Sequence, residues 1–521
     1  MTSPPEETIC LNPATGEEIG RSPLNSVGDV HQAVARGQNA QPFWAGTPLE
    51  ERIAALRAVR DHLAAHADEL AAVISQDNGK TRTDALAAEV LPAAMALTYY
   101  CKHARRFLTD RRLTPGNILL ANKRPKLVRI PFGVVGIISP WNYPFAIPFS
   151  EVVMALLAGN AVILKVASET QLVGRALERA LAAAGLPSGV FTHLNLPGRV
   201  AGEAFLEAGV DKLFFTGSVR VGKQLMAKAA ETLTPLSLEL GGNDAMIVAA
   251  DADLKRAANG AVWAGLQNCG QSCGGVERIY VHREVYPRFL ELLGERVRAL
   301  RIGVDTDHNL DLGAMTTTRQ MDLVRAHVDD ALAQGAEIFS RADPPAGLTG
   351  NFLPALVLTK VTHDMRVMRE ETFGPVLGVM EVGDLEEALE LANDSDLGLT
   401  ASVWSKNTKE AEKLARRIRA GAVTINDHLM SHGLAETPWG GFKESGLGRT
   451  HGELGFAEMT EPQVIVHDIM PFVKKDMWWH PHSKAVYQGL GGIVQMLYGK
   501  GLGKRLGGMM KMMRIFPRTF F

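Results

Sequence analysis

Gly133-Val134-Val135-Gly136-Ile137-Ile138 decides the fold of this chain, together with the helical residues 151–157 and the run Ala161-Val162-Ile163-Leu164-Lys165 that follow it. Short, continuous apolar runs of this kind predict strands buried on both faces. A second helix over 172–184 and a further strand over 212–215 continue the alternation. Strands that alternate with helices predict an α/β fold with a parallel sheet, helices on both faces, and ligands at the carboxyl ends of the strands.

A glycine-containing turn follows the strand that ends at Phe215. It reads Thr216-Gly217-Ser218-Val219-Arg220-Val221-Gly222, and a helix is expected to begin near Lys223. Glycines at such a turn let a phosphate approach the helix N-terminus, where unpaired N–H groups and the helix dipole favour an anion. The turn lacks the Lys-Ser/Thr pair of a P-loop. A phosphate site and a simple tight connection both fit it.

The residues before this region are expected to be mainly helical. Turn signals divide Ile9–Ile19 into a hairpin-like start, and apolar residues then recur at helical spacing from Val27 to Phe107, interrupted at Pro92. Leu113–Arg129 instead predicts a protruding β-hairpin. Its own core is too small to hold it, so we expect it to pack on another element or subunit.

Composition restricts the class of protein. The chain has 521 residues, of which 46% are hydrophobic and 21% charged, as in globular proteins of two or three domains. A net charge of -2 gives no global reason to expect a nucleic-acid partner. Four cysteines are too few for a disulfide framework, which indicates a reducing compartment. Met1–Glu7 has neither the basic nor the apolar region of a signal peptide, so we expect a cytoplasmic protein.

Two side chains are candidates for chemistry. Cys273 stands among small residues in Asn268-Cys269-Gly270-Gln271-Ser272-Cys273-Gly274-Gly275, and the glycines are expected to leave its thiol accessible. Glu239 lies inside the apolar run Leu236–Leu240, where a carboxylate is costly unless it is paired, hydrated or used. The structural alternatives are a buried packing cysteine and a strand-end Glu that faces solvent.

When the motifs around Cys273 and Glu239 are taken together with others along the chain, the stretch from about Ile9 to about Val466 resembles the aldehyde dehydrogenase superfamily. The motifs follow a fixed order: Pro140-Trp141-Asn142-Tyr143-Pro144, Lys165, Gly217-Ser218 with Gly222, Glu239-Leu240-Gly241-Gly242, Gly270-Gln271-Ser272-Cys273, Glu371-Thr372-Phe373-Gly374-Pro375 and Pro438-Trp439-Gly440-Gly441-Phe442-Lys443-Glu444-Ser445-Gly446. The resemblance implies that Cys273 is the nucleophile, Glu239 the general base and Asn142 a donor to the oxyanion. It implies cofactor contacts from Trp141, Lys165, Ser168, Gly217, Ser218, Gly222, Glu371 and Phe373, and a site-closing loop at 438–446.

The resemblance also implies an architecture. We expect a Rossmann-type doubly wound cofactor domain, an α/β catalytic domain that carries Cys273, and a β-hairpin oligomerisation element that pairs with another subunit through Glu461–Val466. The expected product of this pairing is a homodimer or homotetramer. The expected segments are 1–112 with 130–240 for the cofactor domain, 241–440 for the catalytic domain, 113–129 with 455–470 for the oligomerisation element, and 471–521 for a C-terminal extension.

These residues make chemical sense as a set. A Cys thiolate adds to an aldehyde, the amide of Asn142 and the backbone N–H of Cys273 stabilise the oxyanion, a nicotinamide accepts hydride, and Glu239 activates water to hydrolyse the thioester. The expected reaction is oxidation of an aldehyde to a carboxylic acid with NAD or NADP. The alternatives are a CoA-acylating dehydrogenase, a Cys esterase or hydrolase with no redox step, and a non-catalytic scaffold.

Two departures from the family bear on specificity. Ser168 stands where many NAD-preferring members carry a Glu that repels a 2′-phosphate, which admits NADP, while Glu169 one residue later could restore the NAD preference. Phe145, Ile147 and Phe149 are the expected substrate pocket, and no Arg is present there to hold a second carboxylate. We therefore expect a medium or long aliphatic, or otherwise apolar, aldehyde rather than succinic semialdehyde.

Other features carry less weight. Cys269 fits a packed residue better than a resolving thiol. His428 and His432 have a spacing that suits a metal but lack a third ligand, so no metal is expected.

The segment 471–521 is basic and apolar, and Val486, Leu490, Ile493 and Leu497 fall on one helical face. Its longest charge-free run is too short to span a membrane. Peripheral contact with an anionic membrane, and packing on the enzyme or on a partner subunit, are both open.

Overall fold

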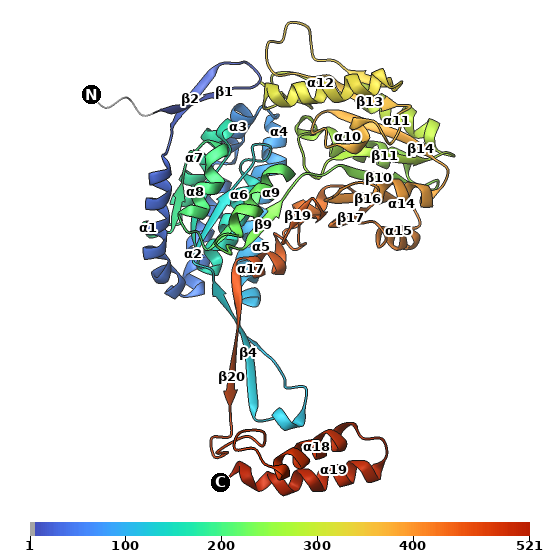
Figure 1. Ribbon diagram of the computed structural model, residues 1–521. Coiled ribbons are helices and arrows are strands. Elements are labelled where there is room, and N and C mark those ends of the chain that lie inside the picture. The colour runs from blue at the N-terminus through green and yellow to red at the C-terminus, as the bar shows by residue number, and fades with distance from the viewer. Residues whose placement is uncertain (1–5) are drawn as a thin grey trace, which may run out of the picture. The chain divides into compact units, whose positions relative to one another are not determined.

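The computed structural model describes residues 6–521, so most of the stretch on which the expectation of no signal peptide rests lies outside the described residues. The chain divides into two units, Met1–Leu108 with Ile130–Glu461 and Thr109–Arg129 with Pro462–Phe521 (Figure 1). The predicted hairpin segment and the predicted C-terminal extension therefore belong to one body. The predicted cofactor and catalytic domains both lie in the first unit.

The first half of the first unit is built on a sheet in the order β19-β9-β8-β5-β6-β7. Its strands are β5 (Val134–Ile138), β6 (Ala161–Lys165), β7 (Phe191–His193), β8 (Lys212–Thr216), β9 (Leu236–Glu239) and β19 (Gly446–Leu447). All pairs are parallel except β19 with β9. Strands β6 and β7 extend the sheet to one side of β5, and β8 and β9 extend it to the other. The strand order therefore reverses beside β5, where a parallel sheet binds its ligands.

Both faces of this sheet are covered, as the sequence predicts. Val135 and Ile137 of β5 pack in one buried cluster with residues of α2, α5, α6 and α7, whereas Val134 and Ile138 pack in another with residues of α1 and α8. Neighbouring residues on one strand enter opposite clusters because side chains alternate across a sheet. The helices are α1 (Val27–Gly46), α2 (Leu49–Ala65), α3 (Ala67–Asn78), α4 (Arg82–Ala85), α5 (Leu91–Leu108), α6 (Ala146–Ala158), α7 (Gln171–Ala182), α8 (Gly198–Glu207), α9 (Val219–Ala229) and α17 (Gly452–Glu458).

The predicted interruption at Pro92 coincides with a helix start. A single π-helical turn over Leu86–Val90 leads into α5, and Pro92 lies in the first turn of that helix. A proline is tolerated there because the first N–H groups of a helix have no intrahelical acceptor. The hairpin-like start is also present, since β1 (Glu7–Leu11) pairs with β2 (Glu18–Pro23) in an antiparallel ladder.

The second half of the first unit has its own core and its own sheet, in the order β12-β13-β14-β11-β10-β16-β17. Its strands are β10 (Asp244–Val248), β11 (Val276–His282), β12 (Glu337–Ala342), β13 (Ala355–Thr359), β14 (Val376–Val382), β16 (Thr400–Trp404) and β17 (Ala422–Ile425). Its helices are α10 (Leu254–Leu266), α11 (Tyr286–Arg298), α12 (Thr318–Ala333), α13 (Arg366–Arg369), α14 (Leu385–Asn393), α15 (Thr408–Ala415) and α16 (Met430–Gly433).

The loop predicted to close the site links the two halves. Its strand β18 (Phe442–Lys443) pairs with β15 (Leu397–Gly398) of the second half, and β19 pairs with β9 of the first. The Ser445 hydroxyl donates to the Gly241 carbonyl at 2.7 Å and accepts from the Gly398 N–H at 2.8 Å. One short loop therefore fixes Glu239, at the end of β9, between the two sheets.

The second unit is a three-stranded sheet and a helical hairpin. β4 (Lys123–Pro131) pairs with β3 (Arg111–Arg112) on one side and with β20 (Thr460–Asp468) on the other. The predicted hairpin thus has one very short arm, with a 3-10 turn at Ile118–Leu120. The strand expected to pair with another subunit has a partner within its own chain, because β4 offers it a free ladder edge.

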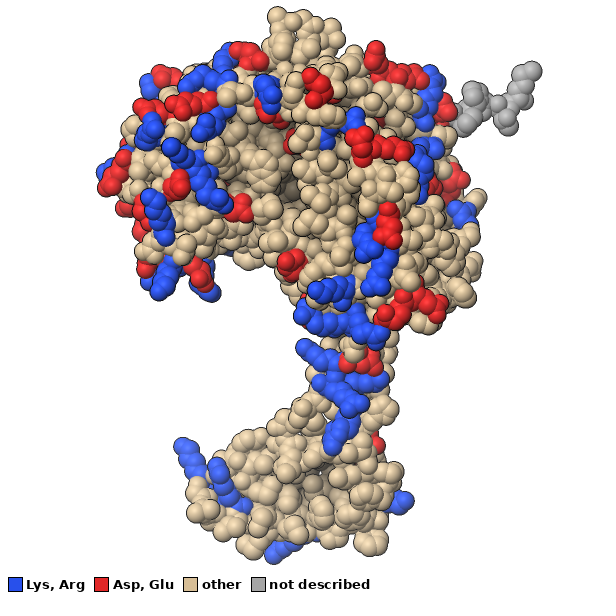
Figure 2. Space-filling view, turned by 180° about the vertical axis from the view of Figure 1, so that it is seen from behind, with Lys and Arg blue, Asp and Glu red and all other residues tan. Residues whose placement is uncertain are grey.

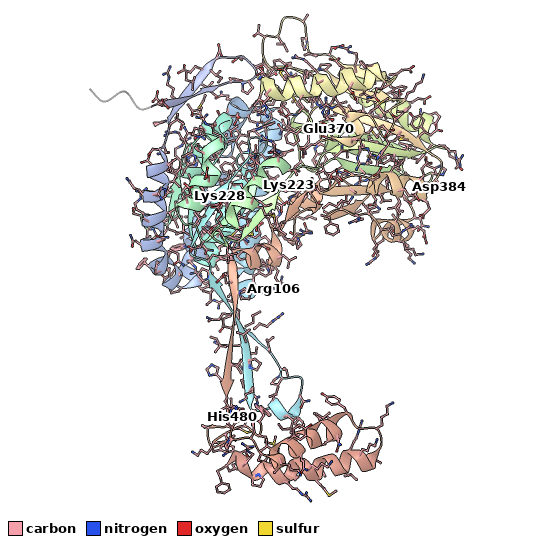
Figure 3. The ribbon with its side chains drawn as sticks, viewed as in Figure 1. Arg106, Lys223, Lys228, Glu370, Asp384 and His480 are labelled. Carbon is pink, nitrogen blue, oxygen red and sulfur yellow. The ribbon has the colours of Figure 1, made fainter. Side chains whose placement is uncertain are left out.

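Residues 484–515 of the second unit form two helices, α18 (Lys484–Tyr498) and α19 (Leu502–Ile515), which come after His480 (Figure 3). Their core holds Met477, Ile493 and Ile515, and Leu490 and Leu497 pack against it. The apolar face predicted for this segment therefore faces the interior of the unit. Among the described residues, no helix is long and apolar enough to cross a membrane.

Candidate active site

Cys273 follows an unusual turn at the end of α10. Asn268, Cys269 and Gly270 have consecutive positive φ values of 50°, 55° and 70°. Two of these three residues carry side chains, for which this left-handed region is strained. The turn leaves Cys273 partly exposed, whereas Cys269 is buried and donates its thiol to the Gly313 carbonyl at 3.2 Å. These contacts support a packing role for Cys269 rather than that of a resolving thiol.

Hydrogen bonds from four parts of the chain hold this turn. Asp84 accepts the Asn268 N–H at 3.0 Å, and the Asn268 side chain donates to the Asn142 carbonyl at 2.9 Å. The Gln271 amide donates to the Asn268 carbonyl at 3.0 Å and accepts the Thr316 N–H at 2.9 Å. Strained backbone persists where its surroundings over-determine it, so this turn presents Cys273 in a fixed position.

The glycines around Cys273 make room for the protein's own packing. A Cβ on Gly274 would lie 2.8 Å from the Trp439 ring, and one on Gly270 would lie 2.1 Å from the Gly374 carbonyl oxygen. A Cβ on Gly242 would come within 2.1 Å of the Cys273 carbonyl oxygen. These glycines let Trp439 and neighbouring backbone pack closely around Cys273, which itself stays partly exposed and lines the spaces described next.

Two spaces meet at Cys273. The smaller, about 20 Å³, is lined by Ile147, Glu151, Thr216, Glu239, Leu240, Cys273, Leu399, His432, Trp439, Thr450 and His451. The larger, about 180 Å³, is lined by Cys273 and by mainly apolar residues, among them Leu91, Met95, Trp263 and Met430. We call them the carboxyl chamber and the apolar cavity. Cys273, Ile147, His432 and Trp439 line both.

The carboxyl chamber holds two buried acids. Glu239 and Glu151 are 6% and 3% exposed. Both carboxylate oxygens of Glu239, and Oε2 of Glu151, lack a hydrogen-bond partner among the described residues. Burial raises the pKa of Glu151 to about 8. Burial first, and then the neighbouring charge of Glu151, raise the pKa of Glu239 well above its usual range. Two carboxyl groups with raised pKa values beside a thiol are suited to holding and moving protons.

The closing loop approaches Glu239 directly. A Cβ on Gly440, which has a φ of 151°, would lie 2.9 Å from Glu239 Oε1. The position also requires a backbone conformation that L side chains rarely adopt. Only glycine at this position lets the loop cover the carboxylate without displacing it.

Asn142 is buried beside the Cys273 turn. Its side-chain amide donates to the Gln271 carbonyl at 3.1 Å. Its own carbonyl accepts the Lys80 ammonium at 2.8 Å, and Lys80 pairs with Glu89 at 2.6 Å, with both side chains fully buried. Glu89 in turn accepts the N–H groups of Phe145 and Ala146 at the start of α6. A buried ion pair therefore fixes both Asn142 and the helix that carries Glu151.

The residues predicted to hold a cofactor's adenosine and pyrophosphate lie at the carboxyl ends of β6 and β8. Lys165 ends β6, is 4% exposed and has no ion-pair partner within the described chain; burial lowers its pKa to about 8. Ser168 is partly buried and Glu169 is exposed. Ser218 precedes α9 without a side-chain cap, so the first N–H groups of this helix are free for an anion. These residues fit a dinucleotide.

The glycines of this turn serve packing as well. A Cβ on Gly222 would lie 2.7 Å from Leu240 Cδ2, so glycine lets α9 pack closely on the end of β9. Lys223 (Figure 3), on the same helix, forms an ion pair with Glu444 of the closing loop at 2.6 Å.

The predicted nicotinamide contacts form a second group. Glu371, next to Glu370 (Figure 3), accepts the Gly242 N–H at 2.9 Å, and burial raises its pKa to about 7. The rings of Trp141 and Phe373 meet edge to face at 5.5 Å. The carboxylate of Glu277 accepts the N–H groups of Thr372 and Phe373, which holds Phe373 at a φ of 52°. These placements leave the nicotinamide contacts a prediction.

The structure corrects the predicted substrate pocket. Ile147 lines both spaces at Cys273, whereas Phe145 and Phe149 are fully buried in the core of the first half, with their rings stacked at 5.5 Å. The reason is helical spacing, since residues four apart share a face of α6 and the residue between them lies on another. More of the apolar cavity comes from the π-helical turn 86–90, α5, α10 and the segment near α16.

His428 and His432 have different surroundings. The His428 ring contacts the Ser402 hydroxyl at 2.8 Å and the Gly274 carbonyl at 3.0 Å, and thereby supports the Cys273 turn. His432 packs against Trp439, with ring centroids 4.8 Å apart. Burial lowers the pKa of both imidazoles to about 4, so both are neutral near pH 7. Within residues 6–521, no group of three His, Cys, Asp or Glu could hold a metal ion.

Two site residues were missed at the level of sequence. Glu151 lies in the apolar stretch Ala146–Ala158, and Glu277 lies in the buried strand β11. Glu151 gave the signal that singled out Glu239, an acid within an apolar run, whereas Glu277 stands directly before Arg278 and gave no such signal.

Comparisons with known proteins agree with this geometry. Residues 1–465 match the aldehyde dehydrogenase family. The chain is 39% identical to a 4,4'-diapolycopene aldehyde oxidase of a Methylomonas species, over 94% of this chain and 91% of that one. It is also 39% identical, over 87% of each chain, to a Mycolicibacterium smegmatis protein whose name marks it provisionally as an NADP-dependent succinate-semialdehyde dehydrogenase.

A solved structure agrees as well. The crystal structure of an NAD-dependent aldehyde dehydrogenase from Sinorhizobium meliloti superposes with a TM-score of 0.85 at 33% identity, over 92% of this chain and 93% of that one. This chain belongs to the aldehyde dehydrogenase family and is an NAD(P)-dependent oxidoreductase that converts an aldehyde to a carboxylic acid.

Proposed function

We propose that this enzyme oxidises medium or long apolar aldehydes and releases the acid by hydrolysis of a thioester on Cys273. The main support for this proposal is the position of Cys273, between an apolar cavity and a chamber that holds two carboxyl groups. The cavity suits the carbon chain of a substrate, and the chamber suits the proton transfers that the reaction needs.

Addition of the thiol to the carbonyl is the first step. Burial, and then the charges of Glu371, Asp244 and Glu239, raise the pKa of the Cys273 thiol, so the resting group is protonated. Glu239, in the same chamber, takes the proton as sulfur bonds to the carbonyl carbon. The carbonyl oxygen becomes an oxyanion, and the backbone N–H of Cys273 and the second amide hydrogen of Asn142 stabilise it. A nicotinamide, when bound, supplies the hydride acceptor that turns this adduct into a thioester.

Hydrolysis completes the reaction. The carboxyl chamber, at about 20 Å³, has room for one water beside Glu239 and Cys273. Glu239 first passes the proton of the thiol to solvent, and it then accepts a proton from this water as the water oxygen bonds to the acyl carbon. The carbon–sulfur bond breaks, and the departing sulfur of Cys273 takes that proton to become a thiol again.

The cofactor is held by the residues named for it: Lys165 and Ser168 on the adenosine ribose, the turn Gly217–Gly222 on the pyrophosphate, and Trp141, Glu371 and Phe373 around the nicotinamide ribose and ring. Ser168 carries no charge to repel a 2′-phosphate, and the name of one relative supports use of NADP. We expect Ser168→Glu to raise the KM for NADP about tenfold or more and to change that for NAD much less. Equal changes for both dinucleotides would contradict this placement.

An apolar substrate is favoured by the lining of the cavity. Its described lining residues include Asp84 and neither Lys nor Arg, so a second carboxylate on the substrate would meet no cation. The name of the Methylomonas relative points to a long polyene aldehyde, and that of the mycobacterial relative to a semialdehyde acid. The lining supports the first kind of substrate.

A spectrophotometric screen tests the proposal. Purified enzyme is mixed with straight-chain aldehydes of increasing length and with succinic semialdehyde, each with NAD and with NADP. We expect NAD(P)H absorbance with kcat/KM rising along the apolar series. CoA-stimulated turnover would favour the acylating alternative, and ester cleavage with no absorbance change would favour a hydrolase.

We also propose a cytoplasmic homodimer or homotetramer that makes a peripheral membrane contact through residues 471–521. β20 is an edge strand of its sheet and exposes Val464 and Val466, which supports pairing of this edge with another subunit. The basic, apolar surface of the extension supports the membrane contact. Light scattering of the purified protein gives the subunit number, and a monomeric mass would contradict the assembly.

A further inference from the structure

The packing of α18 on α19 buries one face of each helix. A Cβ on Gly508 would lie 2.4 Å from the Gly492 carbonyl oxygen, and one on Gly492 would lie 2.6 Å from the Gly508 carbonyl oxygen. The backbones are thus in close contact, and Ile493 and Ile515 fill the seam beside them. The apolar face of α18 that the sequence predicts is therefore buried against α19.

A different apolar face, on α19, is uncovered within the second unit. Leu502, Leu506, Met509, Met513 and Phe516 follow one another at the spacing of a single helical face, and Phe520 continues it. All six are exposed, with Leu502 at 80%, and Met510 at the edge of the row is 62% exposed. We call these seven residues the α19 stripe. Large apolar side chains gathered on one exposed face mark a docking site.

The charge around the stripe is strongly positive. Thr109–Arg129 and Pro462–Phe521 carry 15 Lys and Arg and three Asp, although the whole chain has 55 Lys and Arg against 57 Asp and Glu. Each of the three acids has a cationic partner in the same unit: Asp468 and Asp476 pair with Lys123, and Asp110 pairs with Lys126. The remaining cations include Lys504, Arg505, Lys511, Arg514 and Arg518 near the stripe. Figure 2 shows the Lys and Arg of this unit gathered on its strands and scattered singly over its helical part, with few acids among them.

We infer that the α19 stripe lies on the surface of an anionic lipid bilayer, with Lys504, Arg505, Lys511 and Arg514 against the headgroups. An apolar row flanked by cations is the arrangement that binds such an interface. Two-fold contact between two copies of the stripe would bring like charges together, which opposes self-association. The inference specifies the membrane contact proposed for residues 471–521 and does not depend on the proposed reaction.

Vesicle sedimentation of the full chain tests this inference. The vesicles are pure phosphatidylcholine, or phosphatidylcholine with roughly one third phosphatidylglycerol. We expect binding to the second kind only, and weaker binding as the salt concentration rises. Leu506→Gln with Met510→Gln should lower the partition coefficient at least tenfold. The single variants Lys504→Gln, Lys511→Gln and Arg514→Gln should each lower the partition coefficient about fivefold.

Matched variants in the first unit serve as controls. Met226→Gln with Leu323→Gln removes two exposed apolar side chains, and Lys406→Gln with Lys409→Gln removes two exposed cations. Both should bind vesicles as the parent does. All variants should keep the parent's activity toward a short, water-soluble aldehyde, which shows that the first unit is folded.

The outcomes separate the two levels of the proposal. Anionic-vesicle binding that the stripe variants leave unchanged overturns the stripe and keeps the broader membrane contact. No vesicle binding by the parent overturns both. A smaller lipid-free oligomer in the stripe variants would assign the stripe to a second copy of the chain and also overturn the membrane inference.

Discussion

On one side of Cys273 lies a chamber of about 20 Å³ with two acids, and on the other a cavity of about 180 Å³ with mainly apolar walls. The first has room for a water, and the second accepts a carbon chain. Their separation matters because a thioester must meet water while the rest of the substrate stays out of it. The two spaces divide these tasks, with the thiol between them.

Both spaces also contain features that lower the stability of the folded chain. In the chamber, carboxylate oxygens are buried without hydrogen-bond partners among the residues that the structure describes, which costs stability. The cavity contains exposed apolar side chains such as Met95 and Trp263. Neither feature helps the chain to fold, so both indicate use.

The largest expected effect comes from removing the group that both spaces share. Cys273→Ala should lower kcat by about 10⁴-fold or more, because no acyl intermediate can form. NAD(P)H production from an apolar aldehyde measures it. Cys269→Ala, four residues away, is the control and should keep turnover within a few-fold. Retained activity in Cys273→Ala would end the proposed mechanism.

A smaller effect is expected when only the chamber is altered. Glu239→Gln should still transfer hydride in the first turnover and then release acid about 10²–10³-fold more slowly, because the water lacks a base. Stopped-flow absorbance should show a burst of NAD(P)H followed by a slow phase. If the steady-state rate matches that of the parent, Glu239 is not the base.

An alteration of the cavity alone should leave the chemistry intact. Met95→Glu places a charge in the apolar wall and should raise the KM for a long aldehyde about tenfold, while kcat and the KM for a short aldehyde change little. Leu323→Glu, on the exposed face of α12, is the matched control. Equal losses for short and long aldehydes would mean that the cavity does not bind the chain.

The smallest effect is a shift in the pH profile. Burial, and then the charge of Glu151, raise the pKa of Glu239, so Glu151→Gln should lower that pKa and move the acid limb of kcat toward lower pH. The plateau should fall a few-fold because Glu239 becomes a weaker base. Glu453→Gln, an exposed acid on α17, should not move the limb. A shift to higher pH in Glu151→Gln would contradict the coupling of the two carboxyl groups.

Sequence reasoning reached the parallel sheet because the runs at β5, β6 and β8 are short, apolar and continuous, and burial on both faces demands such runs. It predicts roles for Cys273, Glu239 and Asn142 from local motifs, and the structure brings Cys273 and Glu239 to one chamber. It failed at Phe145 and Phe149, since two apolar residues on one helix do not reveal which face borders a cavity.

The sequence by itself determined the fold class, the order of the motifs and the chemistry that a thiol, a carboxylate and an amide can perform. The tertiary structure decided which side chains surround Cys273. Glu151 and Glu239 come together only because α6 and β9, far apart in the chain, border one chamber, and the α19 stripe is identified only because the predicted face of α18 turns inward. Local patterns record burial and periodicity, whereas packing between distant elements selects which face becomes a site.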